Sequence, residues 1–222
     1  MEIKPECYPC ILLFTLRTAR QVTEDEWLLK KVMNETMEVL RDIGTVQTPP
    51  EVATDVFGRI VRTLGQKDPL KSERERMNTE AKKLLPEAEK LVTTANDPLF
   101  AAMKFAALGN GFDTLFVEKH LLQTKTILEQ FNSKKFHTND YEEFKKDISG
   151  ARRLLYILDN AGEIFFDKLL IRYLKKQYKK MEVTAVVRKD IVFDDATYED
   201  AKAAKIEEDA KVIDCGFSTL GT

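Results

Sequence analysis

The stretch RRLLYILDNAGE, residues 152–163, constrains the fold more than any other part of the sequence. Its apolar run, 154–158, is short and continuous, which is typical of a strand buried on both faces of a parallel sheet. Asp159 and Asn160 follow at once, and an amphipathic helical pattern begins near residue 163. In open α/β sheets, ligands bind at the edge where strands end and helices begin. The alternative is that Asp159 caps the helix and Asn160 is a turn residue.

The rest of the second half repeats this alternation of strand and helix. Apolar runs at 183–187 and 211–214 predict two further strands, with helices between successive strands. Alternating strands and helices predict a parallel sheet with right-handed crossovers. The third strand leads into a Gly-bearing loop, and a three-stranded sheet ending there would expose an edge. We therefore expect the natural protein to continue past Thr222.

The sequence of residues 1–150 predicts an almost wholly helical segment. Apolar periodicity, with Pro, Gly and capping residues at the boundaries, marks successive helical segments from about Cys7 to Ile148. Within the segment that Asp68 opens, Pro86 is expected to kink or divide the helix. The charge-rich run KSERER, 71–76, is expected to form a solvated face. The sequence therefore predicts an α/β protein with a helical first part, 1–150, and an α/β part, 151–222.

Composition narrows the class of protein. Lys+Arg number 35 and Asp+Glu 37, a net charge of -2, which argues against a nucleic-acid partner. The chain lacks an apolar run of the ~20 residues that span a bilayer, and its start does not read as a secretory signal. Three cysteines, an odd number, do not suit a disulfide framework. These features predict a soluble cytoplasmic protein without a membrane or nucleic-acid partner.

Cys7 and Cys10 form a CxxC pair at the start of a helical segment. A redox pair of this type normally follows a strand, and a structural zinc site needs about four ligands. The other candidates, His120, His137 and Cys215, are spread along the chain. Packing is the favoured role for the pair, and metal or thiol chemistry is the alternative.

The oxygen-bearing residues that follow the first two strands predict a metal site. If these strands are parallel neighbours, Asp159, Asn160, Asp194 and Asp195 share one rim of the sheet. Carboxylates and an amide carbonyl without nearby His or Cys suit Mg²⁺, Mn²⁺ or a similar ion. Helix N-termini on that rim also suit a phosphate group. A second cluster, Asn110 and Asp113 in LGNGFD, could be cap and turn residues or could line the same site.

Four motifs resemble those of the DUF89 family, also called the damage-control phosphatase or ARMT1-like family. CYPC (7–10) resembles its N-terminal CxxC, and LGNGFD (108–113) its GNxxD motif. LDNAGE (158–163) resembles its DNxGE motif, and FDDATYEDA (193–201) its NDxTxxDA motif. The final CGFSTLGT resembles the Gly-rich loop after the third strand, and the motifs occur in the family's order, closest to its prokaryotic branch.

The resemblance implies a helical N-terminal domain on a Rossmann-like, three-layer α/β domain. It also implies a metal-dependent phosphatase that acts on sugar phosphates or other small phosphorylated metabolites, with Mg²⁺, Mn²⁺, Co²⁺ or Ni²⁺ as cofactor. The residues matched to these roles are, as metal ligands, Asp159, Asn160 and Asp195; as catalytic residues, Asp159, Asp195, Asp194 and Glu163; and, as substrate-binding residues, Asn110, Asp113, Gly216 and Ser218.

The sequence departs from the family pattern in three places. Asp194 stands where the family usually has Asn, and Ser218 and Leu220 stand where its loop often has Asp and Pro. The family's later Lys-Gly-x-Gly-Asn segment is not within these 222 residues. Two alternatives stay open: a metal- or phosphate-binding protein without turnover, and a protein carboxyl methyltransferase, an activity described for one eukaryotic branch.

Overall fold

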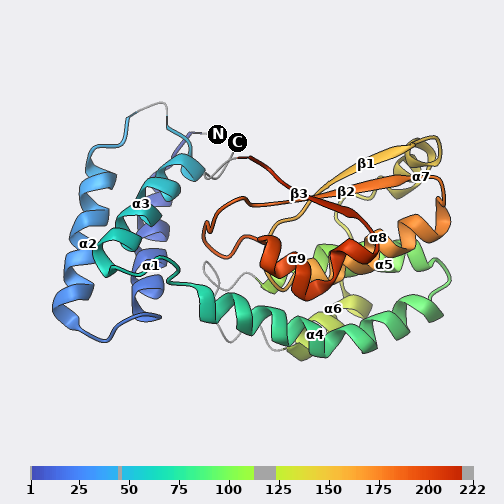
Figure 1. The fold of residues 1–222 in the computed structure, drawn as a ribbon, viewed down its shortest axis with the longest axis horizontal. Helices are drawn as coiled ribbons and strands as arrows, with labels where there is room; N and C mark the ends of the chain where they lie inside the picture. Colours follow the sequence, from blue (N-terminus) through green and yellow to red (C-terminus); the bar gives the residue numbers. More distant parts are fainter. Residues whose placement is uncertain (1, 45–46, 113–123, 217–222) are drawn as a thin grey trace.

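The computed structural model describes residues 2–44, 47–112 and 124–216 (Figure 1). In chain order its elements are α1 (Cys7–Arg20), α2 (Glu26–Arg41), α3 (Pro49–Leu64), α4 (Lys71–Thr94), α5 (Pro98–Gly109), η1 (Asn110–Phe112), α6 (Thr124–Ser133), α7 (Tyr141–Ser149), β1 (Arg153–Ile157), α8 (Ile164–Gln177), β2 (Glu182–Val187), α9 (Tyr198–Ala204), η3 (Ile206–Glu208) and β3 (Lys211–Asp214). Where residues 1–150 are described, their regular elements are all helices. The predicted α/β class with a helical first part is therefore confirmed.

The three strands form one parallel sheet in the order β1-β2-β3. The register pairs Ile157 of β1 with Val186 of β2, and Val187 with Asp214 of β3. Because the strands are parallel and adjacent, their carboxyl ends meet at one rim, as predicted. The loops that leave β1 and β2 at this rim carry the predicted metal ligands.

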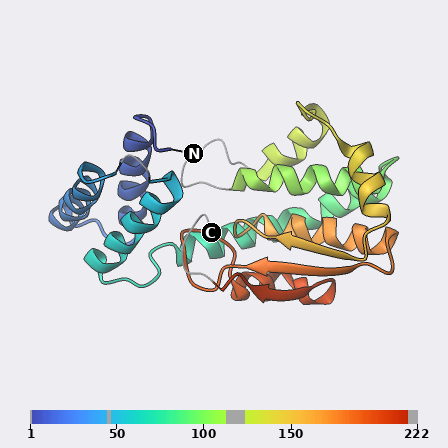
Figure 2. The same ribbon diagram turned by 90° about the horizontal axis from the view of Figure 1, so that it is seen from above.

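The sheet is covered by helices on one face only in the described part of the chain. Figures 1 and 2 show α8 and α9 against the same side of the sheet, with α4 and α5 farther from the strands. Leu154 and Tyr156 of β1 pack toward this side. Leu155 and Ile157 alternate with them and are 61% and 75% exposed on the other face. The expectation that this strand is buried on both faces is therefore wrong for the described residues.

Helix α4 is a single unbroken helix, and its first turns lie near the loop that follows β2. Its 24 residues include Pro86, so this proline does not divide the helix, and the expected kink stays a prediction. The run KSERER at its start is not simply a solvated face either. Glu73 and Arg74 are only 4% and 5% exposed, and Arg74 contacts the loop that follows β2 through the Phe193 carbonyl.

The buried side chains form two clusters. One cluster joins the sheet to α4 and to the helices that follow it. The other joins α1, α2 and α3, and it also takes in Leu70, Val192 and Phe193. Residues 192 and 193 belong to the loop between β2 and α9, so this loop links the three-helix unit to the rest of the protein. Helices α4–α7 belong to the same buried cluster as the sheet. The predicted division into two domains at residue 150 stays a prediction.

None of the described helices is both long enough and apolar enough to cross a membrane. The cytoplasmic location expected from the sequence stays a prediction.

Candidate functional site

Two loops meet at the carboxyl rim of the sheet. Residues 158–163 connect β1 to α8, and residues 188–197 connect β2 to α9. Two backbone hydrogen bonds hold the loops side by side. They run from the Ala196 N–H to the Asp159 carbonyl (2.7 Å) and from the Ala161 N–H to the Asp194 carbonyl (2.8 Å).

The same contact places the predicted ligands next to one another. Asn160 and Asp195 form an isolated antiparallel bridge between the loops. Asn160, Asp194 and Asp195 are 6%, 3% and 7% exposed, whereas Asp159 is open to solvent. The sequence prediction that these four residues share one rim is confirmed. Their roles as ligands or catalytic groups stay predictions.

Asn110, at the carboxyl end of α5, reaches into this site from a third direction. Its Nδ2 donates hydrogen bonds to Asp159 Oδ2 and to Glu163 Oε2, both at 3.2 Å. The preceding Gly109 permits the approach, because a Cβ there would lie 3.2 Å from the Glu163 Cγ and 3.1 Å from the Phe166 ring. Asn110 is therefore both the cap residue of α5 and a bridge between two site carboxylates.

Simultaneous ionisation of Glu163 and Asp167, at the start of α8, is unfavourable. Burial, and next the charge of Asp159, raise the pKa of Glu163 to about 7, although hydrogen bonds from Asn110 and Asn160 oppose the shift. Burial, and next the charge of Glu163, raise the pKa of Asp167 well above its usual value. A cation bound nearby would relieve this repulsion.

Arg188 is a site residue that the sequence prediction missed. Its Nε donates to Asp195 Oδ2 at 2.6 Å, and its side chain is 21% exposed. It also lines a groove of about 330 Å³ on the uncovered face of the sheet, together with Ile157, Cys215 and other residues. The sequence did contain a signal for Arg188. It directly follows the second predicted strand, which places it on the same predicted rim as Asp159.

The residues present fit a divalent ion through oxygen donors. Asp159 and Asp195 offer carboxylates, and Asn160 offers an amide carbonyl, which are the ligands that hard divalent ions take. Within the described ranges, three or more His, Cys, Asp or Glu side chains do not gather as a metal cluster. A metal here would therefore depend on the Asn160 oxygen and on water for its remaining positions.

The other predicted site residues have different outcomes. Gly216 lies just after β3 with a φ of +76°, and its N–H donates to Asp214 Oδ1 at 2.8 Å. Asp113 and Ser218 lie outside the described residues. Cys7 and Cys10 lie in the first turn of α1 as thiols, half-buried and exposed respectively, so a packing role for the pair stays a prediction.

Comparison with known protein families assigns the chain to one of them. Residues 3–222 match the damage-control phosphatase ARMT1-like domain, which is nearly the whole sequence. The chain belongs to the ARMT1-like family. The resemblance seen in four short motifs is therefore confirmed.

Two relatives named damage-control phosphatase come from archaea. A protein of Archaeoglobus fulgidus named damage-control phosphatase is 33% identical over all of this chain and 77% of its own length. A damage-control phosphatase of Pyrococcus horikoshii is 26% identical over all of this chain and 76% of its own length. The crystal structure of a DUF89 family protein from Pyrococcus horikoshii superposes with a TM-score of 0.85 at 25% identity, covering all of this chain and 76% of that one.

Proposed function

We propose that this ARMT1-like chain is a metal-dependent phosphatase of small phosphorylated metabolites, such as sugar phosphates. One observation carries the proposal: two loops rich in oxygen donors are joined by backbone hydrogen bonds at the carboxyl rim of a parallel sheet. Ligands bind at this rim in open α/β folds. The names of the archaeal relatives support phosphatase chemistry.

The proposed ligands are Asp159, Asn160 and Asp195. A divalent ion bound by them would polarise a phosphoryl oxygen and activate water for an in-line displacement. Glu163 and Asp194 would line the same site. Asn110 would keep the carboxylates of Asp159 and Glu163 in place through its two hydrogen bonds.

Arg188 is the proposed phosphate-orienting cation. Its guanidinium group already touches Asp195, so it lies beside the proposed ion. Arginine presents several N–H donors in a plane, which suits two oxygens of one phosphate group. Arg188 also lines the groove on the uncovered face of the sheet, where a phosphate group could approach it.

The test is phosphate release by chelator-treated protein before and after addition of Mg²⁺, Mn²⁺, Co²⁺ or Ni²⁺. The substrates are p-nitrophenyl phosphate and a panel of sugar phosphates. The variants are Asp159→Asn and Asp195→Asn, and the matched control is Glu207→Gln, which removes the same charge from an exposed position on η3. Turnover should require added metal, survive in the control and disappear in both site variants.

Other outcomes separate the alternatives. Metal binding without turnover on any substrate would favour a binding protein. Binding of S-adenosylmethionine by the parent, without phosphate release, would favour the methyltransferase. Metal-independent phosphate release that both site variants retain would contradict the proposed site.

A further inference from the structure

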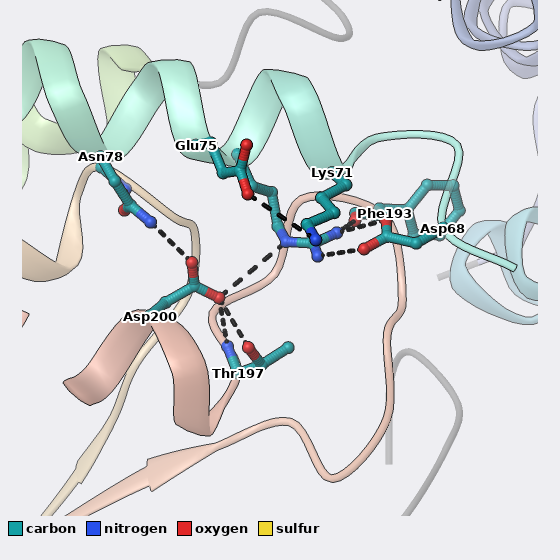
Figure 3. Close-up of polar contacts among 9 residues, drawn as sticks. Asp68, Lys71, Glu75, Asn78, Phe193, Thr197 and Asp200 are labelled. Atoms are coloured by element: carbon teal, nitrogen blue, oxygen red, sulfur yellow. Dashed lines mark hydrogen bonds and ion pairs between the residues drawn. The ribbon is translucent and has the colours of Figure 1, made fainter. Parts of the chain in front are cut away.

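Arg74 and Asn78 lie one turn apart on α4, and both face the two site loops. The charge-rich run 71–76 was expected to form a solvated face, yet Arg74 within it is only 5% exposed. Figure 3 shows Asn78 pointing from α4 toward Asp200 at the start of α9, and Asp68 and Phe193 lying together near the N-terminal end of α4. A single helix therefore contacts both loops that carry the proposed metal ligands.

Asn78 connects the first loop to the helix that follows the second. Its Oδ1 accepts a hydrogen bond from the Gly162 N–H at 2.8 Å, within the Asp159–Glu163 turn. Its Nδ2 donates to Asp200 Oδ1 at 2.7 Å. Asp200 Oδ2 in turn accepts from the N–H and Oγ1 of Thr197, at 2.9 and 2.7 Å, and so closes the capping box of α9.

Arg74 holds the second loop itself. Its Nη1 donates to the Phe193 carbonyl at 3.3 Å, directly before Asp194. Two hydrogen bonds to the carboxylate of Asp68, at 2.9 and 2.6 Å, fix the guanidinium plane. Its Nε also lies 3.9 Å from Asp200 Oδ2. Burial makes these charge-assisted bonds costly to break.

The first loop also lies directly against the α4 backbone. Gly162 has a φ of +80°, and a Cβ there would lie 3.1 Å from both the Cβ and the carbonyl oxygen of Met77. Glycine permits both this conformation and this close approach. Gly162 is thus held by packing on one side and by Asn78 on the other.

We propose that Arg74 and Asn78 are positioning residues that set the spacing of the two metal-binding loops, and thereby the affinity for the divalent ion. This inference rests on the proposed function. A hard divalent ion needs oxygen ligands at about 2.0–2.6 Å, so small movements of either loop weaken binding. The contacts of Asn78 with Gly162 and of Arg74 with the Phe193 carbonyl would hold the two loops at this spacing before the ion binds.

A reciprocal exchange between Asn78 and Asp200 provides the sharpest test. Asn78→Asp sets two carboxylates face to face at the 2.7 Å contact, and Asp200→Asn sets two amide groups there. The double variant restores one donor and one acceptor, still leaves an oxygen for Gly162 and for Thr197, and keeps the parent's charge. Each single variant should weaken Mn²⁺ binding by about tenfold or more, and the double variant should return to within about threefold of the parent.

The readouts are the dissociation constant for Mn²⁺, from electron paramagnetic resonance of the free ion, and amide hydrogen exchange at Gly162 in chelator. Circular dichroism confirms that each variant is folded at the measuring temperature. Val92→Ala is the matched control, since it opens the buried core on the same helix and should lower the melting temperature without changing Mn²⁺ affinity.

Mn²⁺ binding by the folded variants decides whether Arg74 and Asn78 position the two loops. Folded single variants that bind Mn²⁺ like the parent would overturn it, and so would a folded double variant that stays weak. If the single variants do not fold, Arg74→Lys replaces them: it keeps the charge beside Asp68 but loses the planar fork, and it should weaken Mn²⁺ binding severalfold. A parent that does not bind Mn²⁺ would overturn the proposed function and this inference with it; a parent that binds while the variants are unaffected would overturn the inference alone.

Discussion

The ring of Phe193 packs edge-on against the ring of Phe14, with 4.7 Å between the centroids. Phe193 has a φ of +54°, which few non-glycine residues adopt, and it lies directly before Asp194 and Asp195. A second ring, that of Phe57, lies 4.8 Å away. The ring of Phe193 therefore helps to anchor the loop between β2 and α9 in the core of the three-helix unit.

We expect Phe14→Leu and Phe193→Leu to be coupled. Each should lower the free energy of unfolding by about 1–2 kcal/mol, because a buried ring is replaced by a smaller side chain. The double variant should lose about 0.5–1.5 kcal/mol less than the sum, since the ring pair can be lost only once. Urea unfolding measures all three. The pair Phe14→Leu and Phe144→Leu, in different clusters, should be additive; additivity of the first pair would contradict the proposed contact.

Gly162→Ala should destabilise the protein by about 2–3 kcal/mol. The cost combines a left-handed backbone conformation with a contact of 3.1 Å against Met77. Gly111→Ala is the control, because a Cβ there meets nothing within 4 Å. Thermal unfolding in chelator compares the two, and equal stability of both variants would show that the Gly162 turn does not pack on α4 as described.

Asp167 should make stability depend on pH in a defined direction. Its pKa is raised in the folded state, mainly by burial, so the folded chain holds this proton more tightly than the unfolded chain does. The contribution to stability is fully present below the ordinary pKa near 3.8 and is lost as pH rises through the folded-state pKa. Asp167→Asn keeps a partner for the Tyr156 hydroxyl, which lies 2.6 Å away.

The urea midpoint of Asp167→Asn should therefore gain on that of the parent as pH rises from about 4 to 8, measured in chelator. The difference between the two proteins reports the titration of Asp167 together with its coupling to Glu163, whose charge helps to raise the pKa of Asp167. A difference that stays constant over this range would mean that Asp167 titrates at its ordinary pKa.

Arg188→Gln should separate metal binding from substrate binding. Removing a positive charge that contacts Asp195 should strengthen Mn²⁺ binding by up to about tenfold. It should raise KM for a phosphate ester, because a phosphate-orienting cation is lost. Calorimetry and steady-state kinetics measure the two effects, and Arg172→Gln, whose partners Glu89 and Asp209 lie away from the site loops, is the control. Weaker Mn²⁺ binding with an unchanged KM would contradict the role given to Arg188.

The sequence predicted the strands and the rim because both are encoded locally. A change of periodicity near residue 150 marked the start of the sheet, and the order of strand and helix required parallel neighbours. Asp159 and Asp195 then had to share one rim. The bare face of β1 was not predicted, since a run such as LLYIL reads as buried on both faces whether or not anything covers it.

The contacts made by α4 could not be predicted in the same way. Arg74 and Asn78 find their partners, Phe193 and Asp200, more than a hundred residues away in the sequence, and Arg74 lies within a charge-rich run. A charge-rich run predicts a solvated helix face unless the tertiary partner is known. Arg188 was missed for a related reason. Its place in the site depends on its contact with Asp195 in the folded loop, and it is not part of a recognisable motif.

Calorimetric titration of chelator-treated protein with Mn²⁺ tests directly whether Asp159 and Asp195 hold a divalent ion. We expect saturable binding of about one ion by the parent and by Glu207→Gln, because the site provides a single set of oxygen donors. Asp159→Asn and Asp195→Asn should each bind at least about tenfold more weakly while remaining folded. Heats that are identical for the parent and both site variants would contradict the metal site, and the phosphatase proposal that depends on it would fall.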